Sequence, residues 1–256
     1  MSNNRLSVKI AQSQDDIEAV QRLRFDVFFN EYQAQAYTDS HADGLDRDMF
    51  DEHCAHLMVV DNSQDGRVVA TTRLLLSARK PADVPYIAAS EFSIPLLGEK
   101  TGNYMEVGRS CVHKDYRDGN AIQLLWRGIT KFVFAYDIDF LFGCASFHET
   151  DADKIATELS YLYHRHLGEG KTLARALEHM PMDRVPADQI DDKSAMASLP
   201  PLIKAYLQLG GVVGDGVALD DQFNTLDIMM TVEIAKVPQT YVKFFKKQAD
   251  RLEMTP

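Results

Sequence analysis

The sequence predicts a mixed α/β protein in which helices cover both faces of a mixed β-sheet. Predicted strands, one hairpin and amphipathic helices alternate along the 256 residues in the order β-α-β-β-β-α-β-α-α-β-α. The run at residues 140–147 (FLFGCASF) is apolar throughout, which is typical of a central strand covered on both faces. No flexible linker interrupts the chain, so we expect one domain over residues 1–256.

The first half of the chain is predicted to hold four strands and two helices. Apolar residues at three- and four-residue spacing predict helices at residues 15–32 and 118–137. Residues 33–53 show no period and are expected as an ordered loop. The segment NSQDG has the length and Asp-Gly chemistry of a hairpin turn between two strands. Runs of apolar and β-branched residues predict the four strands at residues 6–11, 56–61, 67–77 and 104–113.

The second half alternates strands and helices around a polar segment. Residues 178–199 are polar and acidic and contain two prolines, so we expect a polar insertion there. Besides residues 140–147, a last strand is predicted at residues 226–235. The same periodicity argument predicts three helices at residues 151–167, 201–209 and 239–252.

Composition excludes several classes of function. The chain has 27 Lys and Arg against 38 Asp and Glu, a net charge of −11, which argues against unspecific binding to nucleic acid. No apolar stretch approaches the ~20 residues that span a bilayer, and the N-terminus carries no apolar signal core. The three cysteines show no metal-type spacing and are interpreted as reduced core thiols. We therefore expect a cytoplasmic protein without a metal site.

The most informative stretch is residues 105–113 (MEVGRSCVH), in which Glu106 and Arg109 interrupt an apolar strand. Ionisable side chains are costly in a covered sheet unless they are paired or face a cleft. In a regular strand the two would point to opposite faces, and a β-bulge at Gly108 would bring both to one side. A salt bridge closing a sheet edge is the structural alternative to a catalytic role.

The turn after this strand leads into the longest predicted helix. It contains Lys114, Arg117 and Gly119, and a strand, a turn and a helix N-terminus in this order suit an anionic ligand. A plain turn with a helix start explains the same residues.

A second group of charges lies earlier in the chain. Arg24 falls on the apolar side of a predicted helix, Arg73 lies inside a strand, and three carboxylates between them could hold an amine. An aspartate-rich loop is more often a solvated surface. The three carboxylates are those of Asp46, Asp48 and Asp51.

Together these residues resemble a known family. The order and spacing of the motifs are similar to those of acyl-homoserine-lactone synthases and, more closely, of ornithine Nα-acyltransferases, over about residues 15–245. The motifs shared with both groups are Arg24 with Val27 and Phe28, Asp48 with Asp51, residues 73–75 (RLL), and Glu106 with Arg109. Those resembling the second group are residues 90–92 (SEF), 106–112 (EVGRSCV), 124–129 (LLWRGI), 143–147 (GCASF), 200–207 (PPLIKAYL) and 221–227 (DQFNTLD).

The resemblance implies a GNAT-type fold, a splayed mixed sheet of about six to seven strands with helices on both faces. It also implies an N-acyltransferase that moves a fatty, 3-hydroxy acyl chain from the 4′-phosphopantetheine thioester of acyl carrier protein to the α-amine of ornithine or a similar amino acid, without a cofactor. In this reading Glu106 and Arg109 are catalytic. The acceptor would contact Arg24, Phe28, Asp48, Asp51 and Arg73, and the donor Val112, Lys114, Arg117 and Gly119.

Two features favour a protein-borne donor over acyl-CoA. The Arg117–Gly119 spacing departs from the loop with which acetyl-CoA-dependent members hold pyrophosphate. Basic residues on the last predicted helix, together with Lys114 and Arg117, would attract an acidic carrier protein. A solvated helix face explains the basic residues of the last helix equally well. The helix residues concerned are Lys243, Lys246, Lys247 and Arg251.

Three alternatives stay open at this point. They are a lactone-type signal synthase, an acyl-CoA-dependent GNAT enzyme, and a non-catalytic module that binds acyl carrier protein or lipid. The only tryptophan, Trp126, lies far from the position that lactone synthases use, which weakens the first. At most peripheral contact with the inner membrane is expected.

Overall fold

The computed structural model describes residues 5–35, 43–98, 102–250, 252 and 254. These residues fold as two compact units. Unit 1 comprises residues 1–84, 105–138 and 239–256, and unit 2 comprises residues 85–104 and 139–238. The expectation of a single domain over residues 1–256 stays a prediction. Residues 36–42, which belong to the expected loop at 33–53, lie outside the described residues. So does Arg251, one of the basic residues expected to meet a carrier protein.

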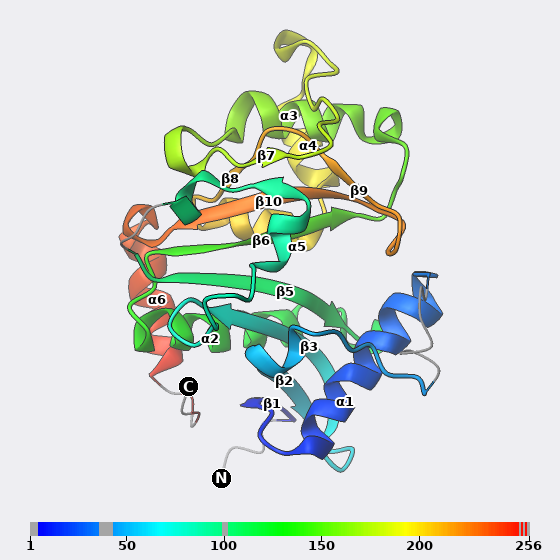
Figure 1. Ribbon diagram of the computed structural model, residues 1–256, viewed down its shortest axis with the longest axis vertical. Coiled ribbons are helices and arrows are strands. Elements are labelled where there is room, and N and C mark those ends of the chain that lie inside the picture. Colours follow the sequence, from blue (N-terminus) through cyan, green and yellow to red (C-terminus); the bar gives the residue numbers. More distant parts are fainter. Residues whose placement is uncertain (1–4, 36–42, 99–101, 251, 253, 255–256) are drawn as a thin grey trace. The chain divides into compact units, whose positions relative to one another are not determined.

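Unit 1 is built on four antiparallel strands in the order β1-β2-β3-β5 (Figure 1). The predicted hairpin is confirmed, because the turn between β2 and β3 has Asp65 and Gly66 at positive φ. The four strands predicted in this half are confirmed to within two residues. They are β1 (Leu6–Ile10), β2 (Ala55–Asp61), β3 (Arg67–Leu76) and β5 (Tyr104–Val112).

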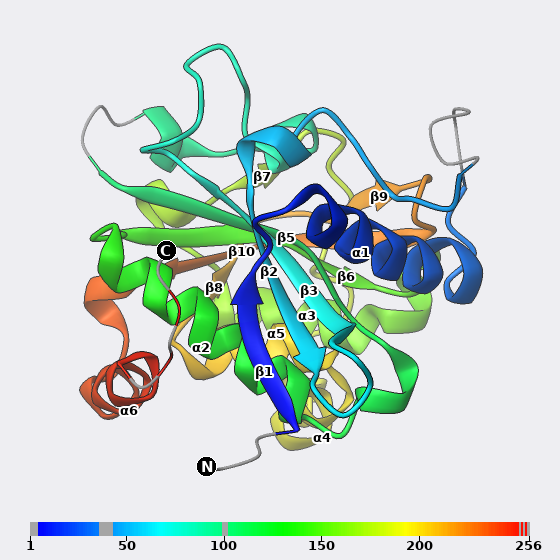
Figure 2. The ribbon, with the colours of Figure 1, turned by 90° about the horizontal axis from the view of Figure 1, so that it is seen from below.

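Two helices cover opposite faces of these strands (Figure 2). On one face Val20 of α1 (Gln14–Phe25) packs with Met58 and Val60 of β2. On the other face α2 (Asn120–Ala135) approaches closely at Gly128, where an added Cβ would lie 2.9 Å from Leu57 Cδ1. Side chains alternate between the two faces of a strand, so strand residues that point to the same side as Met58 face α1. A π-helix (Asp26–Glu31) extends α1, and α6 (Gln239–Ala249) packs on α2.

Unit 2 is built around the long antiparallel pair β6 (Phe140–Phe147) and β10 (Thr225–Glu233), with Ala145 opposite Ile228. Two short strands, β8 (Val212–Val213) and β9 (Ala218–Asp220), pair with β10, and β4 (Phe92–Ser93) pairs with β7 (Arg175–Ala176). Helices α3 (Ala156–His166), α4 (Asp192–Ser198) and α5 (Pro201–Gln208) complete the unit. The mixed α/β architecture is thus confirmed.

The expected polar insertion at residues 178–199 is anchored to α3. Ser160 Oγ accepts hydrogen bonds from Arg184 N (2.9 Å) and Val185 N (2.8 Å) and donates one to Met182 O (3.0 Å). The segment also forms α4, capped by Asp191. The side-chain cap at Asp191 allows this short helix to form within the polar stretch. That residues 178–199 are an insertion stays a prediction.

None of the helices in the described part of the chain is both long and apolar enough to cross a bilayer.

Candidate active site

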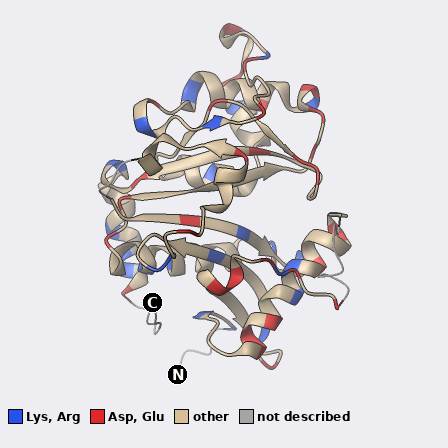
Figure 3. Cartoon of the chain, in the orientation of Figure 1, with Lys and Arg blue, Asp and Glu red and all other residues tan. Residues whose placement is uncertain are grey.

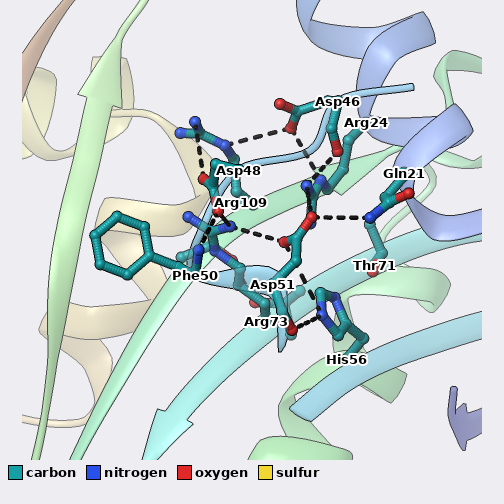
Figure 4. A network of polar contacts seen from close by, with 12 residues as sticks. Gln21, Arg24, Asp46, Asp48, Phe50, Asp51, His56, Thr71, Arg73 and Arg109 are labelled. Carbon is teal, nitrogen blue, oxygen red and sulfur yellow. Dashed lines mark hydrogen bonds and ion pairs between the residues drawn. The ribbon is translucent and has the colours of Figure 1, made fainter. Parts of the chain in front are cut away.

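A network of guanidinium and carboxylate groups lies on the α1 face of the unit 1 sheet (Figure 4). The loop before β2 supplies the three carboxylates of Asp46, Asp48 and Asp51. Strand register and helix position, not sequence proximity, bring the charges together. The guanidinium groups come from α1, β3 and β5, and belong to Arg24, Arg73 and Arg109.

The inner part of the network consists of Arg24, Asp46, Asp51 and Arg73. Arg24 Nε donates to Asp46 Oδ2, and its Nη1 and Nη2 donate to the two oxygens of Asp51, each at 2.9 Å. Arg73 Nη1 donates to Asp51 Oδ1, also at 2.9 Å. The side chains of both arginines are 1% exposed. A buried carboxylate held by two arginines is costly to disturb, because removing one partner leaves a buried charge uncompensated.

The outer part of the network consists of Asp48 and Arg109. Their side chains are 27% and 21% exposed, against 8% for Asp51. Arg109 Nη2 lies 3.7 Å from Asp48 Oδ2, and Arg109 Nε lies 3.3 Å from Asp46 Oδ2. Arg73 Nη1 ties Asp48 to the inner part at 2.7 Å. The outer part is therefore partly exposed, whereas the inner part is enclosed.

The arginines favour the ionised forms of Asp48 and Asp51. Burial raises the pKa of Asp51, but the hydrogen bonds and charge of Arg24 and the charge of Arg73 outweigh burial and hold that pKa well below its ordinary range. The pKa of Asp48 is lowered in the same way, by Arg73 against burial. The thiol of Cys54 lies in the same field, and burial raises its pKa to about 12. Cys54 is therefore a protonated thiol near neutral pH and a poor nucleophile.

A β-bulge in β5 brings Arg109 to this face. Arg73 pairs with Gly108 and Thr71 with Cys111, so the two residues between Gly108 and Cys111 face the single residue Thr72. The extra residue is Arg109, which has φ of 49°, and a hydrogen bond of 2.8 Å joins Thr72 Oγ1 to Ser110 Oγ. The predicted bulge is confirmed, one residue after the expected Gly108, because Arg109 itself takes the left-handed conformation.

Glu106 lies on the same face as Arg73. It pairs with Leu75, two residues from Arg73, and alternation places the side chains of Glu106, Leu75 and Arg73 on one side of the sheet. Glu106 is 3% exposed, and its charge is one of those that raise the pKa of Cys54. The bulge thus brings Glu106 and Arg109 to one side, as the sequence predicted.

Two buried residues of the network were not predicted. Gln21 Nε2 donates to Asp51 Oδ2 at 2.9 Å, and His56 Nε2 lies 3.0 Å from Asp51 O. Gln21 precedes Arg24 by three residues, which puts both on one face of α1. His56 stands opposite Arg73 in the register of β2 and β3. The sequence did contain a signal for both residues. Gln21 lies one turn from Arg24 on a predicted helix, and His56 is a polar residue in a predicted apolar strand.

Phe28, an expected acceptor contact, packs against apolar residues. It is partly buried and packs with Leu23, Val27 and Cys111. The structure therefore places it in an apolar cluster next to α1.

The predicted donor residues gather at the turn after β5. Arg117 donates a hydrogen bond to Val112 O at 3.0 Å, forms an ion pair with Glu31 at 2.5 Å, and lies over the ring of Tyr32. Lys114 is exposed. The pKa of Arg117 is raised, chiefly by the hydrogen bond to Glu31. Within unit 1, Arg117 thus joins the turn to the π-helix that follows α1.

A carboxylate, that of Asp118, already lies at the N-terminus of α2. Gly119 takes a left-handed conformation (φ 94°), and Asp118 accepts hydrogen bonds from Asn120 N at 3.0 Å and from Asn120 Nδ2 at 2.8 Å. An anionic side chain here satisfies the helix dipole and repels a second anion. This arrangement does not favour a pyrophosphate at the start of α2.

Unit 2 carries a separate polar cluster made of Glu91, Cys144 and Asp227. Among the described residues, their ligand-type atoms lie within 4.8 Å of one another. Cys144 Sγ donates to Glu91 Oε2 at 3.7 Å, and Thr225 Oγ1 donates to Asp227 at 2.8 Å. All three members come from motifs that carry the family resemblance.

Comparison with curated proteins decides the family. The L-ornithine N(alpha)-acyltransferase of Rhizobium meliloti (strain 1021) is 37% identical over 254 residues, which cover 96% of this chain and 86% of the relative. The protein of the same name from Brucella abortus (strain 2308) is 35% identical, over 96% of this chain and 90% of the relative. The chain belongs to this acyltransferase family.

Further comparisons agree with this assignment. A family model described as an acetyltransferase (GNAT) domain matches residues 23–127 of this acyltransferase, the range that contains the three arginines and three aspartates of the network. A CoA-dependent acyl-homoserine lactone synthase, BjaI, solved with SAM and isopentyl-CoA, superposes with a TM-score of 0.54 at 16% identity. That likeness covers 98% of this chain and 93% of BjaI, and it shows the shared fold. The predicted GNAT-type fold and acyltransferase class are thus confirmed.

Proposed function

We propose that this acyltransferase moves a fatty, 3-hydroxy acyl chain from the thioester of acyl carrier protein to the α-amine of ornithine or a similar diamino acid. The acceptor class is supported by the relatives' shared name. The observation that carries the acceptor assignment is the outer part of the network, where an accessible guanidinium and an accessible carboxylate lie 3.7 Å apart. An amino acid with one carboxylate and a second amine complements this pair.

In this proposal Arg109 holds the acceptor's α-carboxylate, since a planar guanidinium offers two parallel donors. Asp48 holds the second amine. Arg24, Arg73 and Asp51 do not contact the acceptor, because their side chains are only 1%, 1% and 8% exposed. They position Asp48 and the loop that carries it. This assigns Arg24, Arg73 and Asp51 a different role from the acceptor contact predicted from the sequence.

Glu106 is proposed as the base. The acceptor's α-ammonium must lose a proton before it attacks, and a buried carboxylate on the same face is suited to take it. The amine nitrogen then attacks the thioester carbon, the carbon–sulfur bond breaks, and the thiolate leaves and is protonated. Direct transfer is supported by Cys54, since a thiol with a pKa of about 12 does not form an acyl-enzyme readily.

The donor proposal is supported by the turn after β5. The carboxylate of Asp118 lies at the start of α2, and Arg117 is paired with Glu31, so this turn does not favour the pyrophosphate of CoA. Acyl carrier protein presents the same thioester on a phosphopantetheine arm. Its acidic surface would find Lys114 exposed at this turn.

Mass spectrometry of reaction products tests the proposal. The purified protein is incubated with a 3-hydroxyacyl thioester on acyl carrier protein, on CoA or on pantetheine, and with ornithine, lysine, norvaline or S-adenosylmethionine. We expect Nα-acyl-ornithine from the carrier-protein donor as the fastest product. A homoserine lactone product would establish the signal-synthase alternative. Faster turnover with acyl-CoA would overturn the donor assignment, and no product with any pair would favour a binding module.

A further inference from the structure

The last helix of unit 1 exposes an unusual combination of side chains. In α6 the rings of Tyr241 and Phe244 are 38% and 55% exposed, which makes them two of the most exposed large hydrophobic side chains among the described residues. Lys243, Lys246 and Lys247 are exposed as well, and the helix contains no acidic residue. Exposed aromatic rings flanked by lysines are typical of helices that lie in a membrane interface.

The spacing puts the rings and the lysines on one side. Tyr241, Phe244 and Lys247 follow one another at three-residue intervals, and Lys243 precedes Lys247 by one turn. On the opposite side Ala249 is buried and α6 packs against α2, where Lys246 Nζ lies 5.7 Å from the ring centre of Phe134. The outward side, here called the α6 face, is therefore formed by Tyr241, Lys243, Phe244 and Lys247.

The charge of the α6 face is opposite to that of the whole chain. The chain carries −11, whereas Gln239–Ala249 carries three lysines and no carboxylate, and Asp250 follows only at the end of the helix (Figure 3). Because charges in solution are screened over about 10 Å, a surface in contact with the α6 face responds to the lysines and not to the total charge.

We propose that the α6 face docks onto an anionic phospholipid surface. The rings of Tyr241 and Phe244 would enter the boundary between headgroups and acyl chains, and the lysines would extend to the phosphates. Acidic lipid attracts basic residues that lie near the surface. An acidic protein partner would explain the lysines but would leave the exposed Phe244 without a matching apolar site. This inference goes beyond the proposed function, and its test does not depend on turnover.

Vesicle flotation of the full chain tests the proposal, in the absence of any carrier protein or substrate. The vesicles contain phosphatidylcholine alone or with about 30% phosphatidylglycerol. We expect binding only to the anionic vesicles, weakening as salt rises. The double variant K243E/K247E should lower the partition coefficient at least about tenfold, since each lysine near the surface contributes about a factor of five. Y241A/F244A should lower it by a similar factor at high salt, where the charge contribution is small.

Matched variants control for net charge and for exposed apolar area. K9E/K193E changes the charge equally at lysines exposed elsewhere, and L177A/L219A removes exposed apolar side chains in unit 2. Both should bind vesicles like the unchanged protein. Equal losses in test and control variants, or no binding to anionic vesicles, would overturn the proposal. So would K243E/K247E if it left vesicle binding unchanged and raised the KM for the acyl carrier substrate instead, because the α6 face would then bind protein.

Discussion

The inner and outer parts of the charged network both consist of arginine and aspartate side chains, but they differ in how deeply these are buried. Asp51 and Asp48 lie three residues apart on one loop, and Arg73 contacts both. Asp51 is enclosed by two arginines and a glutamine, whereas Asp48 and Arg109 keep about a quarter and a fifth of their side chains exposed. Burial, not residue type, therefore separates the groups that hold the site together from the groups that can meet a substrate.

The largest effect is expected from breaking the inner part. Asp51→Asn leaves Arg24 and Arg73 buried without their shared anion and should reduce the free energy of unfolding by ~3–5 kcal/mol. In a chain of this size that corresponds to a melting temperature lower by roughly 8–15 °C. Thermal denaturation followed by circular dichroism checks it. Asp48→Asn serves as the matched control and should lower the melting temperature far less.

The contribution of Asp51 to the free energy of unfolding depends on pH. The folded-state pKa of Asp51 is below its ordinary value of 3.8, so the stabilisation is complete above about pH 5. It is lost as the pH falls through 3.8 and below, because the unfolded chain takes up the proton first. Acid denaturation of the Asp51→Asn variant should therefore show a shallower pH dependence than that of the unchanged protein.

Glu106 breaks the simple rule, since it is as buried as the inner residues but is proposed to act in the reaction. Glu106→Gln keeps the shape of the side chain and should reduce kcat by roughly 10²-fold or more. Its melting temperature should stay within a few degrees of the unchanged value. A variant that melts early but reacts at a normal rate per folded molecule would make Glu106 a structural residue.

Arg109 should separate binding from folding. Arg109→Lys keeps the positive charge but loses the two-donor fork, so we expect kcat/KM for the acceptor to fall about 10–100-fold, mainly through KM. The same change at Arg24 should act on stability instead. Steady-state kinetics and melting curves of the two variants, compared side by side, check this. Similar stability losses in both would place Arg109 in the inner part.

The smallest effect is expected at His56, on the inner side. Burial and the charges of Arg24 and Arg73 lower its pKa below 6.5, against the opposing effect of Asp51. The folded chain therefore resists protonation of His56, so its contribution to stability is complete above about pH 6.5 and declines as the pH falls below that value. His56→Gln should flatten the change in unfolding free energy between pH 7.5 and 5.5. An unchanged slope would show that folding does not lower the pKa of His56.

Much of the fold was predictable because long periodic segments carry strong signals. The four strands of unit 1 and the helix α2 follow from alternation and apolar spacing alone. The strands β4, β7, β8 and β9 have only two or three residues each, too few to show a period. The places of β4 and β7 are set by their pairing with each other from distant parts of the chain, whereas β9 pairs with β10 across residues 221–224.

The charged residues of the candidate site could be predicted from the sequence, but Gln21, His56 and the pairing of the charges could not. Arg24, Arg73 and Arg109 stood out as charges inside apolar segments, and the bulge was expected near Gly108. The loop of Asp46, Asp48 and Asp51 has no period, so the sequence could not tell which carboxylate is enclosed. That depends on how the loop crosses α1 and β3, a tertiary property.

The most direct test of the account measures Asp48→Asn with two acceptors. Ornithine carries a side-chain amine and norvaline lacks it, and both are assayed with the same acyl carrier donor. If Asp48 holds the second amine, the variant raises the KM for ornithine at least about tenfold, leaves the KM for norvaline nearly unchanged, and melts close to the unchanged protein. An equal rise in KM for both acceptors, or a loss of activity explained by unfolding, would contradict the account. In that account the inner part stabilises the site and the outer part binds the acceptor.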